Sequence, residues 1–473
     1  MYTSPQLPPF EFGIAEPFDA LRKSVPPRLM ALAAKGPALL GLAPPTIVAA
    51  GLAHLAAAIG RSVLLDDGTC NLAPGFNLTI LNDTSSSLEW LSGIGRGWLE
   101  NTVLLRSLTP DKARSVLRQY IQEAVVQSPK SRGGDPQIDQ YLESIPKNAV
   151  NMLRTQYVGH KTDPAALVNS LVHSSDHAVA AINGAMDPLH EWARLTPGKK
   201  HQLTEMLTMS WKGKPMEISS TGGFVPASLT CLWQTSTAAV KEAFISKHST
   251  SAKNPPPLLM FRQQGIPLRF PRVEATESVA WFECLKCAFG NRLQSLEPAV
   301  VVLEPDIKRL AAVWFEQFES ALAKAPQSLQ PQLSWIPDLV LRIYLILLLS
   351  SSMHTVLGAV PTDPKGQQPL PLPEKQKIMC DAIALTRWLA QEHYCAVQTI
   401  TETETLTFTD STDIQAVADG ILQRLKDHGP LPRRDLQRSF HALSAQTRDN
   451  AIQSLKSKGL VTDDQDGMLR QVA

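Results

Sequence analysis

The chain has 473 residues, a formal net charge of +1, 44% hydrophobic residues and 19% charged residues. This length and composition are typical of a globular protein with two to four domains and exclude a disordered chain. The near-neutral charge excludes a general attraction to nucleic acid or acidic membranes, so any such binding requires a local patch.

The sequence also indicates a cellular compartment. Six cysteines are too few for a disulfide framework. The first residues, MYTSPQLPPFEFG, lack the basic and apolar regions of a signal peptide. The most apolar run, residues 343–349, is far shorter than the roughly 20 residues of a membrane helix, so we expect a core helix there. We therefore expect a cytoplasmic protein with no membrane partner.

The first expected elements are helical. Residues 46–59 are rich in alanine and apolar on nearly all sides, which predicts a buried helix. Gly60 can end this helix, and residues 62–65 would begin a strand. We assign residues 1–75 to an N-terminal helical segment.

Residues 76–97, FNLTILNDTSSSLEWLSGIGRG, combine a strand, a tight turn and a helix start. P-loop proteins bind phosphate at such a junction, through glycines that let the backbone approach and a lysine that supplies charge. Neither is present in this turn. Gly93, Gly95 and Gly97 follow, but their spacing differs from the dinucleotide fingerprint and no proper strand precedes them, so we expect a loop there.

Strands and helices alternate as far as residue 273. Strands are predicted at residues 177–186, 210–219 and 227–234, with helices starting near residues 163 and 235. This alternation predicts an α/β layer of parallel strands, which we assign to residues 76–275. From residue 273 the pattern is helical almost throughout, so residues 276–400 are expected to form a helical domain.

The tail, residues 413–473, has a different pattern. Helices are predicted at residues 413–428, 433–440 and 444–458, followed by a hairpin around an Asp466-Gly467 turn. Three helices and a hairpin predict a winged helix.

The tail also carries the clearest charge signal. Between Arg424 and Lys458, eight basic residues stand against three acidic ones, so we expect DNA contact there. The candidate DNA-binding residues are Arg433, Arg434, Arg438, Arg448, Lys456 and Lys458. A winged helix that binds protein and exposes a solvated basic face is the alternative, and the acidic residues of the hairpin argue against a wing that lies along phosphates.

Seven segments of the chain carry a family resemblance through their order: LGLAPPTIVAAGLAHLAAAIGRSVLL, FNLTILNDTSSSLE, WKGKPMEI, ASLTCLWQTS, GIPLRFPRV, LVLRIYLILLL and IMCDAIALTRWLAQEHYCAV. In this order they resemble an uncharacterised domain family of primase–helicase-like proteins from prophages, plasmids and other mobile elements. The resemblance covers most of residues 17–397 and includes Arg342, Ala382 and His393 at the helical end. It implies a RecA-like, P-loop NTPase-type core.

The resemblance places the family's Walker A loop at NDTSSSLE, where the chemistry differs. The glycine positions hold Asn82, Ser85 and Ser87. Leu88 replaces the lysine and supplies no charge to a phosphate, and Glu89 replaces the metal-binding hydroxyl with a carboxylate. Binding of Mg-ATP in the usual mode is therefore expected to fail.

The Walker B slot, in AVAAINGAMD, is altered as well. Asn183 and Gly184 stand where the family has two acids, so no carboxylate is left to hold a metal. Gln234 and Arg269 occupy positions that resemble a sensor residue and an arginine finger. Alternatively, Gln234 satisfies a strand end and Arg269 pairs on the surface.

No other pattern indicates catalysis. Cys284 and Cys287 form a single C-x-x-C without a second ligand pair, so we expect structural cysteines and no metal. We expect no catalytic residue and no cofactor.

The sequence thus predicts a catalytically inactive NTPase-like protein that serves as a nucleic-acid-associated structural or interaction subunit of a mobile-element, replication or defence complex. Protein partners or a second copy of the chain are expected. Two alternatives stay open. One is an active ATPase or helicase-like protein with a non-standard phosphate site, and the other is a pure protein-interaction subunit.

Overall fold

The structure is a computed structural model, and it divides the chain into two compact units, Met1–Gln398 and Thr399–Ala473. The residues that it describes are 8–14, 17–82, 89–107, 158–159, 164–174, 176–182, 189, 195–218, 223–241, 256–268, 272, 274–294, 297–355, 370–407, 411–432, 445–463 and 468–471. The four domains expected from the sequence stay predictions.

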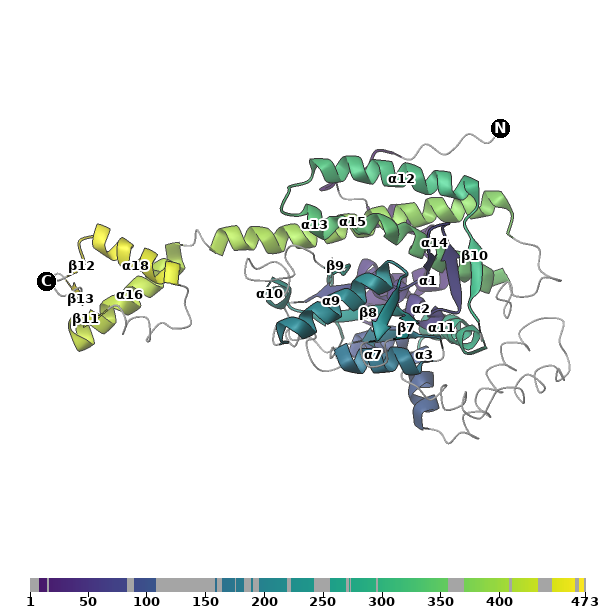
Figure 1. Cartoon of the computed structure of the whole chain (residues 1–473), viewed down its shortest axis with the longest axis horizontal. Coiled ribbons are helices and arrows are strands. Elements are labelled where there is room, and N and C mark those ends of the chain that lie inside the picture. Colours follow the sequence, from purple (N-terminus) through teal and green to yellow (C-terminus); the bar gives the residue numbers. More distant parts are fainter. Residues whose placement is uncertain are drawn as a thin grey trace. The chain divides into compact units, whose positions relative to one another are not determined.

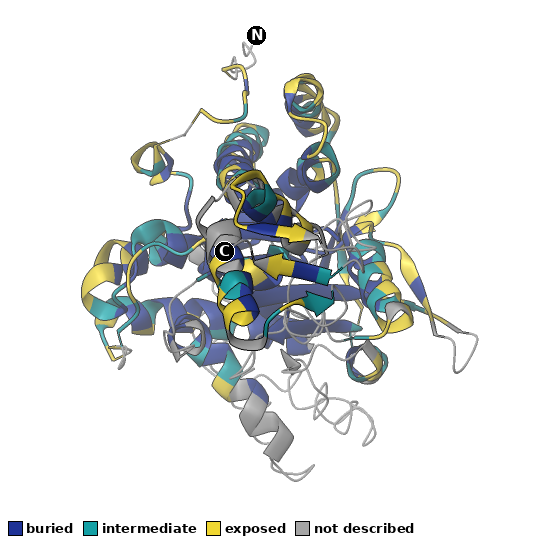
Figure 2. Ribbon diagram, turned by 90° about the vertical axis from the view of Figure 1, so that its left-hand side faces the viewer, coloured by how far each residue is buried: buried dark blue, intermediate teal, exposed yellow. Residues whose placement is uncertain are grey.

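A five-stranded parallel sheet forms the centre of the first unit (Figure 1). Its strands are β3 (Leu78–Leu81), β4 (Val158–Gly159), β5 (Ala178–Ile182), β8 (Ser228–Thr235) and β9 (Leu259–Arg262). They lie in the order β4-β5-β8-β3-β9, and every neighbouring pair is parallel. All residues of β3, β5 and β8 are buried, as expected for a parallel sheet covered on both faces (Figure 2). The predicted α/β class is confirmed.

Helices surround this sheet. The described helices of the first unit are η1 (Phe18–Leu21), α1 (Pro27–Leu39), α2 (Pro44–Ile59), α3 (Glu89–Ser107), α7 (Pro164–His173), α9 (Pro197–Trp211), α10 (Thr237–Val240), α11 (Thr276–Gln294), α12 (Pro305–Lys324), α13 (Gln330–Leu333), η4 (Ile336–Asp338), α14 (Leu339–Thr355) and α15, which starts in this unit and spans Leu372–Thr407. Helix α2 contacts β3, β5, β8 and β9, as well as α1, α3 and α11. Every residue from Thr46 to Ile59 is buried, which confirms the predicted buried helix.

A second sheet contains a strand that the sequence pattern missed. Its members are β1 (Val63–Asp66), β2 (Asn71–Leu72) and β10 (Ala299–Val302), in the order β10-β1-β2. Strand β1 is the one predicted at residues 62–65. The expectation of helix almost throughout from residue 273 is wrong at β10, because this run of three valines pairs in parallel with β1, far away in the chain.

Two further predictions on strands have different outcomes. The strand expected in residues 210–219 is confirmed only at β6 (Pro215–Ile218), which forms a hairpin with β7 (Gly223–Pro226). Ser210 and Trp211 instead form the end of helix α9. By contrast, the family resemblance implies a strand at GIPLRFPRV, and the structure has the strand earlier, at β9. Its apolar residues Leu259, Met260 and Phe261 fill the buried edge position beside β3, and the GIPL segment follows outside the sheet.

The three spaced glycines lie within helix α3, so the loop expected there is wrong. A Cβ atom at Gly95 would lie 2.2 Å from Cε1 of His54 in α2. A Cβ atom at Gly97 would lie 2.8 Å from Cβ of Phe282 in α11. These distances are too short for any side chain, so the glycines allow α3 to approach α2 and α11 closely.

One helical run among the described residues, Gln330–Ser351, is long and apolar enough to cross a membrane by length and composition. Most of it is buried inside the first unit. The core helix predicted at residues 343–349 lies in α14, and all seven of these residues are buried. Its apolar surface is therefore covered by the rest of the unit.

The second unit has its own small core. Its described elements are α16 (Ser411–His428), β11 (Leu431–Pro432), α18 (Ala445–Ser457), β12 (Val461–Asp463) and β13 (Met468–Gln471). The strands form an antiparallel sheet in the order β11-β13-β12, which confirms the predicted terminal hairpin. Ile421, Leu455 and Leu469 are among the buried residues that pack together between the two helices and the sheet. The helix predicted at residues 433–440 lies outside the described residues.

Candidate functional site

The carboxyl edge of the five-stranded sheet is the candidate site, because the parallel strands all end there. Asn82 follows β3, and its N–H donates to the carbonyl oxygen of Thr235, at the end of β8, over 2.8 Å. On the other side of β3, the N–H of Gln263 donates to the carbonyl oxygen of Leu81 over 3.0 Å. The ends of β8, β3 and β9 are thus held in register by backbone hydrogen bonds.

Gln234 lies on β8 opposite Ile80 of β3, one residue before the strand ends. Its side chain is buried, and its Nε2 donates to Oε1 of Gln263 over 3.0 Å. Gln263 Nε2 in turn donates to the carbonyl oxygen of Gly265 over 3.2 Å. The sequence pattern singled out Gln234 but missed Gln263, whose position is set only by the pairing of β9 with β3.

Among the described residues, an exposed arginine also lies at this edge. Arg262 is the last residue of β9, pairs in register with Leu81 and is exposed. The sequence pattern gave no reason to select it.

The remaining predicted positions fall mostly outside the described residues. The positions outside are Ser85, Ser87, Leu88, Asn183, Gly184 and Arg269. Glu89 is the first residue of α3, but its side chain is not among those described. The structure therefore brings Asn82 and Gln234 to the same edge of the sheet, and the roles of the other positions stay predictions.

Arg342 of α14, one of the positions in the family resemblance, is fully buried beneath the start of β3. Its guanidinium donates to the carbonyl oxygens of Ala73 over 2.6 Å and Gly75 over 3.2 Å, and also to that of Trp211 at the end of α9. Burial lowers its pKa to about 10, although the negative charge of Asp338 acts to raise this pKa. The side chain is therefore charged at neutral pH. Arg342 thus joins three segments. Its guanidinium is engaged by these carbonyl oxygens and is not positioned to bind a phosphate at the carboxyl edge.

His393 of α15, the second such position, caps the outer edge of β9. The N–H of Met260 donates to its Nδ1 over 2.9 Å, so its Nε2 carries the proton and donates to the carbonyl oxygen of Gln332 over 3.0 Å. The ring is fully buried, and this burial lowers its pKa to about 4. A neutral histidine therefore takes the place of a neighbouring strand at this backbone N–H.

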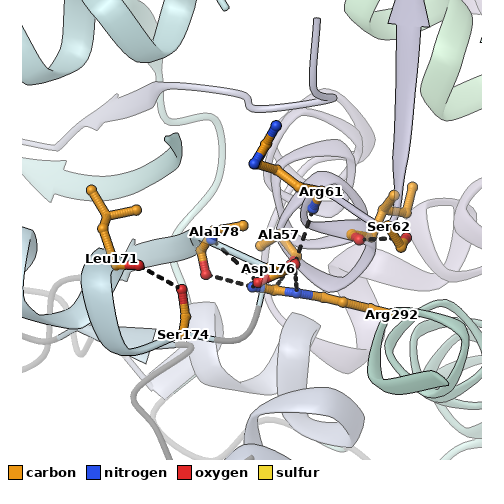
Figure 3. A network of polar contacts seen from close by, with 9 residues as sticks. Ala57, Arg61, Ser62, Leu171, Ser174, Asp176, Ala178 and Arg292 are labelled. Atoms are coloured by element: carbon orange, nitrogen blue, oxygen red, sulfur yellow. Dashed lines mark hydrogen bonds and ion pairs between the residues drawn. The ribbon is translucent and has the colours of Figure 1, made fainter. Parts of the chain in front are cut away.

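A buried ion pair lies at the opposite end of β5 (Figure 3). Arg292 of α11 contacts both carboxylate oxygens of Asp176, at 2.7 and 3.0 Å. The carboxylate also accepts the N–H groups of Arg61 and Ala178, and Arg292 donates to the carbonyl oxygen of Ala57 over 2.7 Å. The polar groups of Asp176 and Arg292 are engaged in these structural contacts. The cluster therefore joins α2, β5 and α11 and does not form a reactive site.

The cysteines give no sign of a reactive or metal-binding site in the described part of the chain. All six are free thiols, and burial raises the pKa of Cys284 to about 12. Cys287 follows on α11, half-buried, and its pKa is raised by burial too. Within the described ranges, no group of three or more His, Cys, Asp or Glu side chains is arranged to hold a metal ion.

In the second unit, part of the predicted basic surface can be located. Lys458 is exposed and Lys456 half-buried, both at the carboxyl end of α18. Arg424 and Lys426 are exposed on α16. Arg470, which was not among the predicted residues, is exposed on β13. The side chain of Arg448 in α18 is not described. The positions outside the described residues are Arg433, Arg434 and Arg438.

Lysines at the end of α18 also have a purely structural explanation. Positive charges near a helix carboxyl end interact favourably with the helix dipole and with the last carbonyl groups. Lys456 and Lys458 therefore do not distinguish a DNA-binding surface from a solvated helix end.

Comparison with known proteins gives no match: no family model, no curated protein and no solved structure matches this chain. The resemblance of the sequence segments to primase–helicase-like proteins therefore stays a prediction.

Proposed function

We propose that the chain is a RecA-like, P-loop-type protein that has lost its nucleotide chemistry and serves as a non-enzymatic, nucleic-acid-associated subunit. The order of the central sheet carries the proposal. Counted along the chain, its five strands lie in the order 2-3-4-1-5. In a RecA-type core the phosphate loop follows the first strand, which lies between the fourth and fifth, and that is the place of β3 here.

The side chains at the carboxyl edge support the loss of nucleotide chemistry. Where a P-loop needs a lysine and a magnesium-binding hydroxyl, the sequence has Leu88 and Glu89. The amides of Gln234 and Gln263 contact each other at the end of β8 and β9. An amide pair can hydrogen-bond a polar group, but it does not neutralise the charge of a triphosphate.

The second unit supports a nucleic-acid role, since its described elements follow the order helix, strand, helix, strand, strand. With the helix predicted at residues 433–440, this is the order of a winged helix. The basic excess of the same region supplies the charge for phosphate contacts. A cytoplasmic location and a mobile-element, replication or defence complex remain part of the proposal.

A second candidate function is an active NTPase with a non-standard phosphate site, and Arg262 favours it. This exposed cation stands at the end of β9, beside the end of β3, where an anion at the strand edge could be contacted. The pure protein-interaction subunit is the third possibility, and no contact among the described residues favours it specifically.

Calorimetric titration of the full chain with Mg-ATP tests the loss of nucleotide chemistry. We expect no saturable heat up to millimolar nucleotide. Micromolar affinity for Mg-ATP would overturn the proposal that the protein has lost its nucleotide chemistry. If that affinity is lost in Arg262→Ala but kept in Arg272→Ala, another exposed arginine of the first unit, the second candidate replaces it.

Fluorescence anisotropy with labelled duplex DNA at several salt concentrations tests the nucleic-acid role. We expect binding that weakens steeply with salt, since each neutralised phosphate contributes about 0.9 to the logarithmic slope. Removing the charges of Arg433, Arg434 and Arg438 together should lower this slope, whereas Arg22→Ala in the first unit should not. Binding that survives the triple substitution unchanged would remove the winged helix from the proposal.

A further inference from the structure

The N-terminal arm, residues 8–13, is held by one surface of the first unit through both its side chains and its backbone. Phe10 is the anchor, with only 4% of its surface exposed. Its ring lies edge-on to Trp314 at 5.1 Å between centroids and stacks on Phe318 at 5.8 Å. Phe12 follows, with its ring 5.4 Å from Phe318 and 5.1 Å from Tyr394.

Two side chains of α15 bind the backbone of the arm. Arg387 donates to the carbonyl oxygens of Pro8 over 2.6 Å and Pro9 over 3.1 Å. Gln391 accepts the N–H of Gly13 over 2.8 Å and donates to the carbonyl oxygen of Glu11.

This surface holds the arm through aromatic side-chain contacts and through hydrogen bonds to its main chain. Apolar side chains of an extended peptide give specificity and its main-chain hydrogen bonds give affinity, which is the usual mode of peptide recognition. Proline has no N–H, so the carbonyl groups that Arg387 binds are the only backbone polar groups of the first two residues. We name the receiving residues the arm site: Trp314, Phe318, Arg387, Gln391 and Tyr394.

The arm is joined to the rest of the unit by a short connection. Gly13 has a φ of +85°, a turn conformation that favours glycine, and Ile14 is 60% exposed. The chain is next anchored where Phe18 contacts Trp388, with the ring centroids 5.4 Å apart. Between these two anchors the described residues bury little, so opening the connection sacrifices few contacts.

We propose that the arm site also receives the arm of a second copy, so that two chains exchange their arms reciprocally and form a dimer. Each arm makes the same contacts in either chain, which is why exchange is a low-cost route to a dimer. The proposal is independent of any nucleotide or DNA role.

A cross-linking experiment on full chains tests the exchange. Phe12→Cys is placed in chains with one affinity tag and Phe318→Cys in chains with another, and the two are mixed, equilibrated and oxidised. We expect a disulfide-linked product that carries both tags and increases with concentration. Wild-type chains mixed with Phe318→Cys chains show the background from the six native cysteines.

Further variants make the outcome decisive. Adding Arg387→Ala to the Phe318→Cys chain should lower the mixed product at least tenfold, whereas adding Arg22→Ala, an exposed arginine that pairs with Asp19, should leave it unchanged. In a chain that carries both Phe12→Cys and Phe318→Cys, an intramolecular disulfide shows that the arm docks on its own chain. Internal closure without mixed product would confine the arm to its own chain and overturn the proposal, as would mixed product that Arg387→Ala leaves unchanged or the absence of both products.

Discussion

At the scale of single residues, the buried side chains of Arg292, Arg342 and His393 connect distant segments of the first unit. Each bonds to segments that are far apart in the sequence. Buried polar groups need partners because an unpaired one loses its hydration without compensation. These residues therefore fix how α11, α14 and α15 attach to the sheets.

His393 should make stability depend on pH. Its pKa falls from about 6.5 in the unfolded chain to about 4 in the native unit, so only the unfolded chain takes up the proton between these values. The free energy of unfolding is therefore highest above pH 6.5. It decreases as the pH falls towards 4, by on the order of 3 kcal/mol in all, because protonation of His393 favours the unfolded chain.

Urea unfolding of the wild type and His393→Gln between pH 7 and pH 4 measures this effect. Glutamine keeps an acceptor for Met260 and a donor for Gln332 but does not titrate, so the variant should be less sensitive to pH across this window. Equal pH dependence in the two proteins would show that His393 is not responsible.

Removing one partner of the Asp176–Arg292 ion pair should lower the stability of the protein more than replacing both partners. Asp176→Asn leaves a buried guanidinium without its counter-charge, and we expect a loss of about 3–5 kcal/mol in the free energy of unfolding. Replacing both, with Asp176→Leu and Arg292→Met, should restore part of this loss.

Glu100→Gln is the matched control, because it removes an exposed pair with Arg96 and should cost less than about 1 kcal/mol. Chemical denaturation of the three variants gives the comparison. A similar cost for Asp176→Asn and Glu100→Gln would contradict the structural role of the buried pair.

At the scale of elements, α3 depends on glycine in a way that helix propensity would not suggest. Glycine is unfavourable inside a helix by about 1 kcal/mol relative to alanine. At Gly95 this preference is outweighed by packing, since an added methyl group would overlap the ring of His54. The ring also accepts a hydrogen bond from Nε1 of Trp98 over 3.2 Å, so it has little freedom to move away.

Alanine substitutions at two helical glycines should therefore have opposite effects. Gly95→Ala should destabilise the protein by about 1–3 kcal/mol through overpacking. Gly290→Ala in α11, where nothing lies within 4 Å of an added Cβ, should stabilise it by about 0.5–1 kcal/mol. Thermal and urea unfolding measure both. Stabilisation by Gly95→Ala would mean that α3 does not approach α2 as closely as described.

At the scale of the whole molecule, the two units have separate cores, so damage to one core should remain local. Leu455 is fully buried among the apolar residues of the second unit. Leu455→Ala should reduce the stability of that unit by about 2–5 kcal/mol. Hydrogen exchange followed by peptide mass spectrometry should show faster exchange in α16 and α18, with little change in β3 and β8. Equal acceleration in both units would indicate that they unfold together.

The sequence by itself determined most of the individual elements. Strand β3, the buried helix α2, strand β5 and the terminal hairpin follow from hydrophobic periodicity and turn residues, which depend on near neighbours in the chain. It also placed Asn82 and Gln234 at strand ends, and parallel strands bring such ends to one edge.

Only the tertiary structure decided how the elements combine. The order of the central sheet, the pairing of β10 with β1, the contact of Gln234 with Gln263 and the ion pair of Asp176 with Arg292 join residues that are distant in sequence. No local pattern encodes such pairs, because the free energy that selects them comes from burial and from partners present only after folding. For the same reason, the three spaced glycines predicted a loop from the sequence alone. Their place in α3 depends on the close packing of α2 and α11 against this helix.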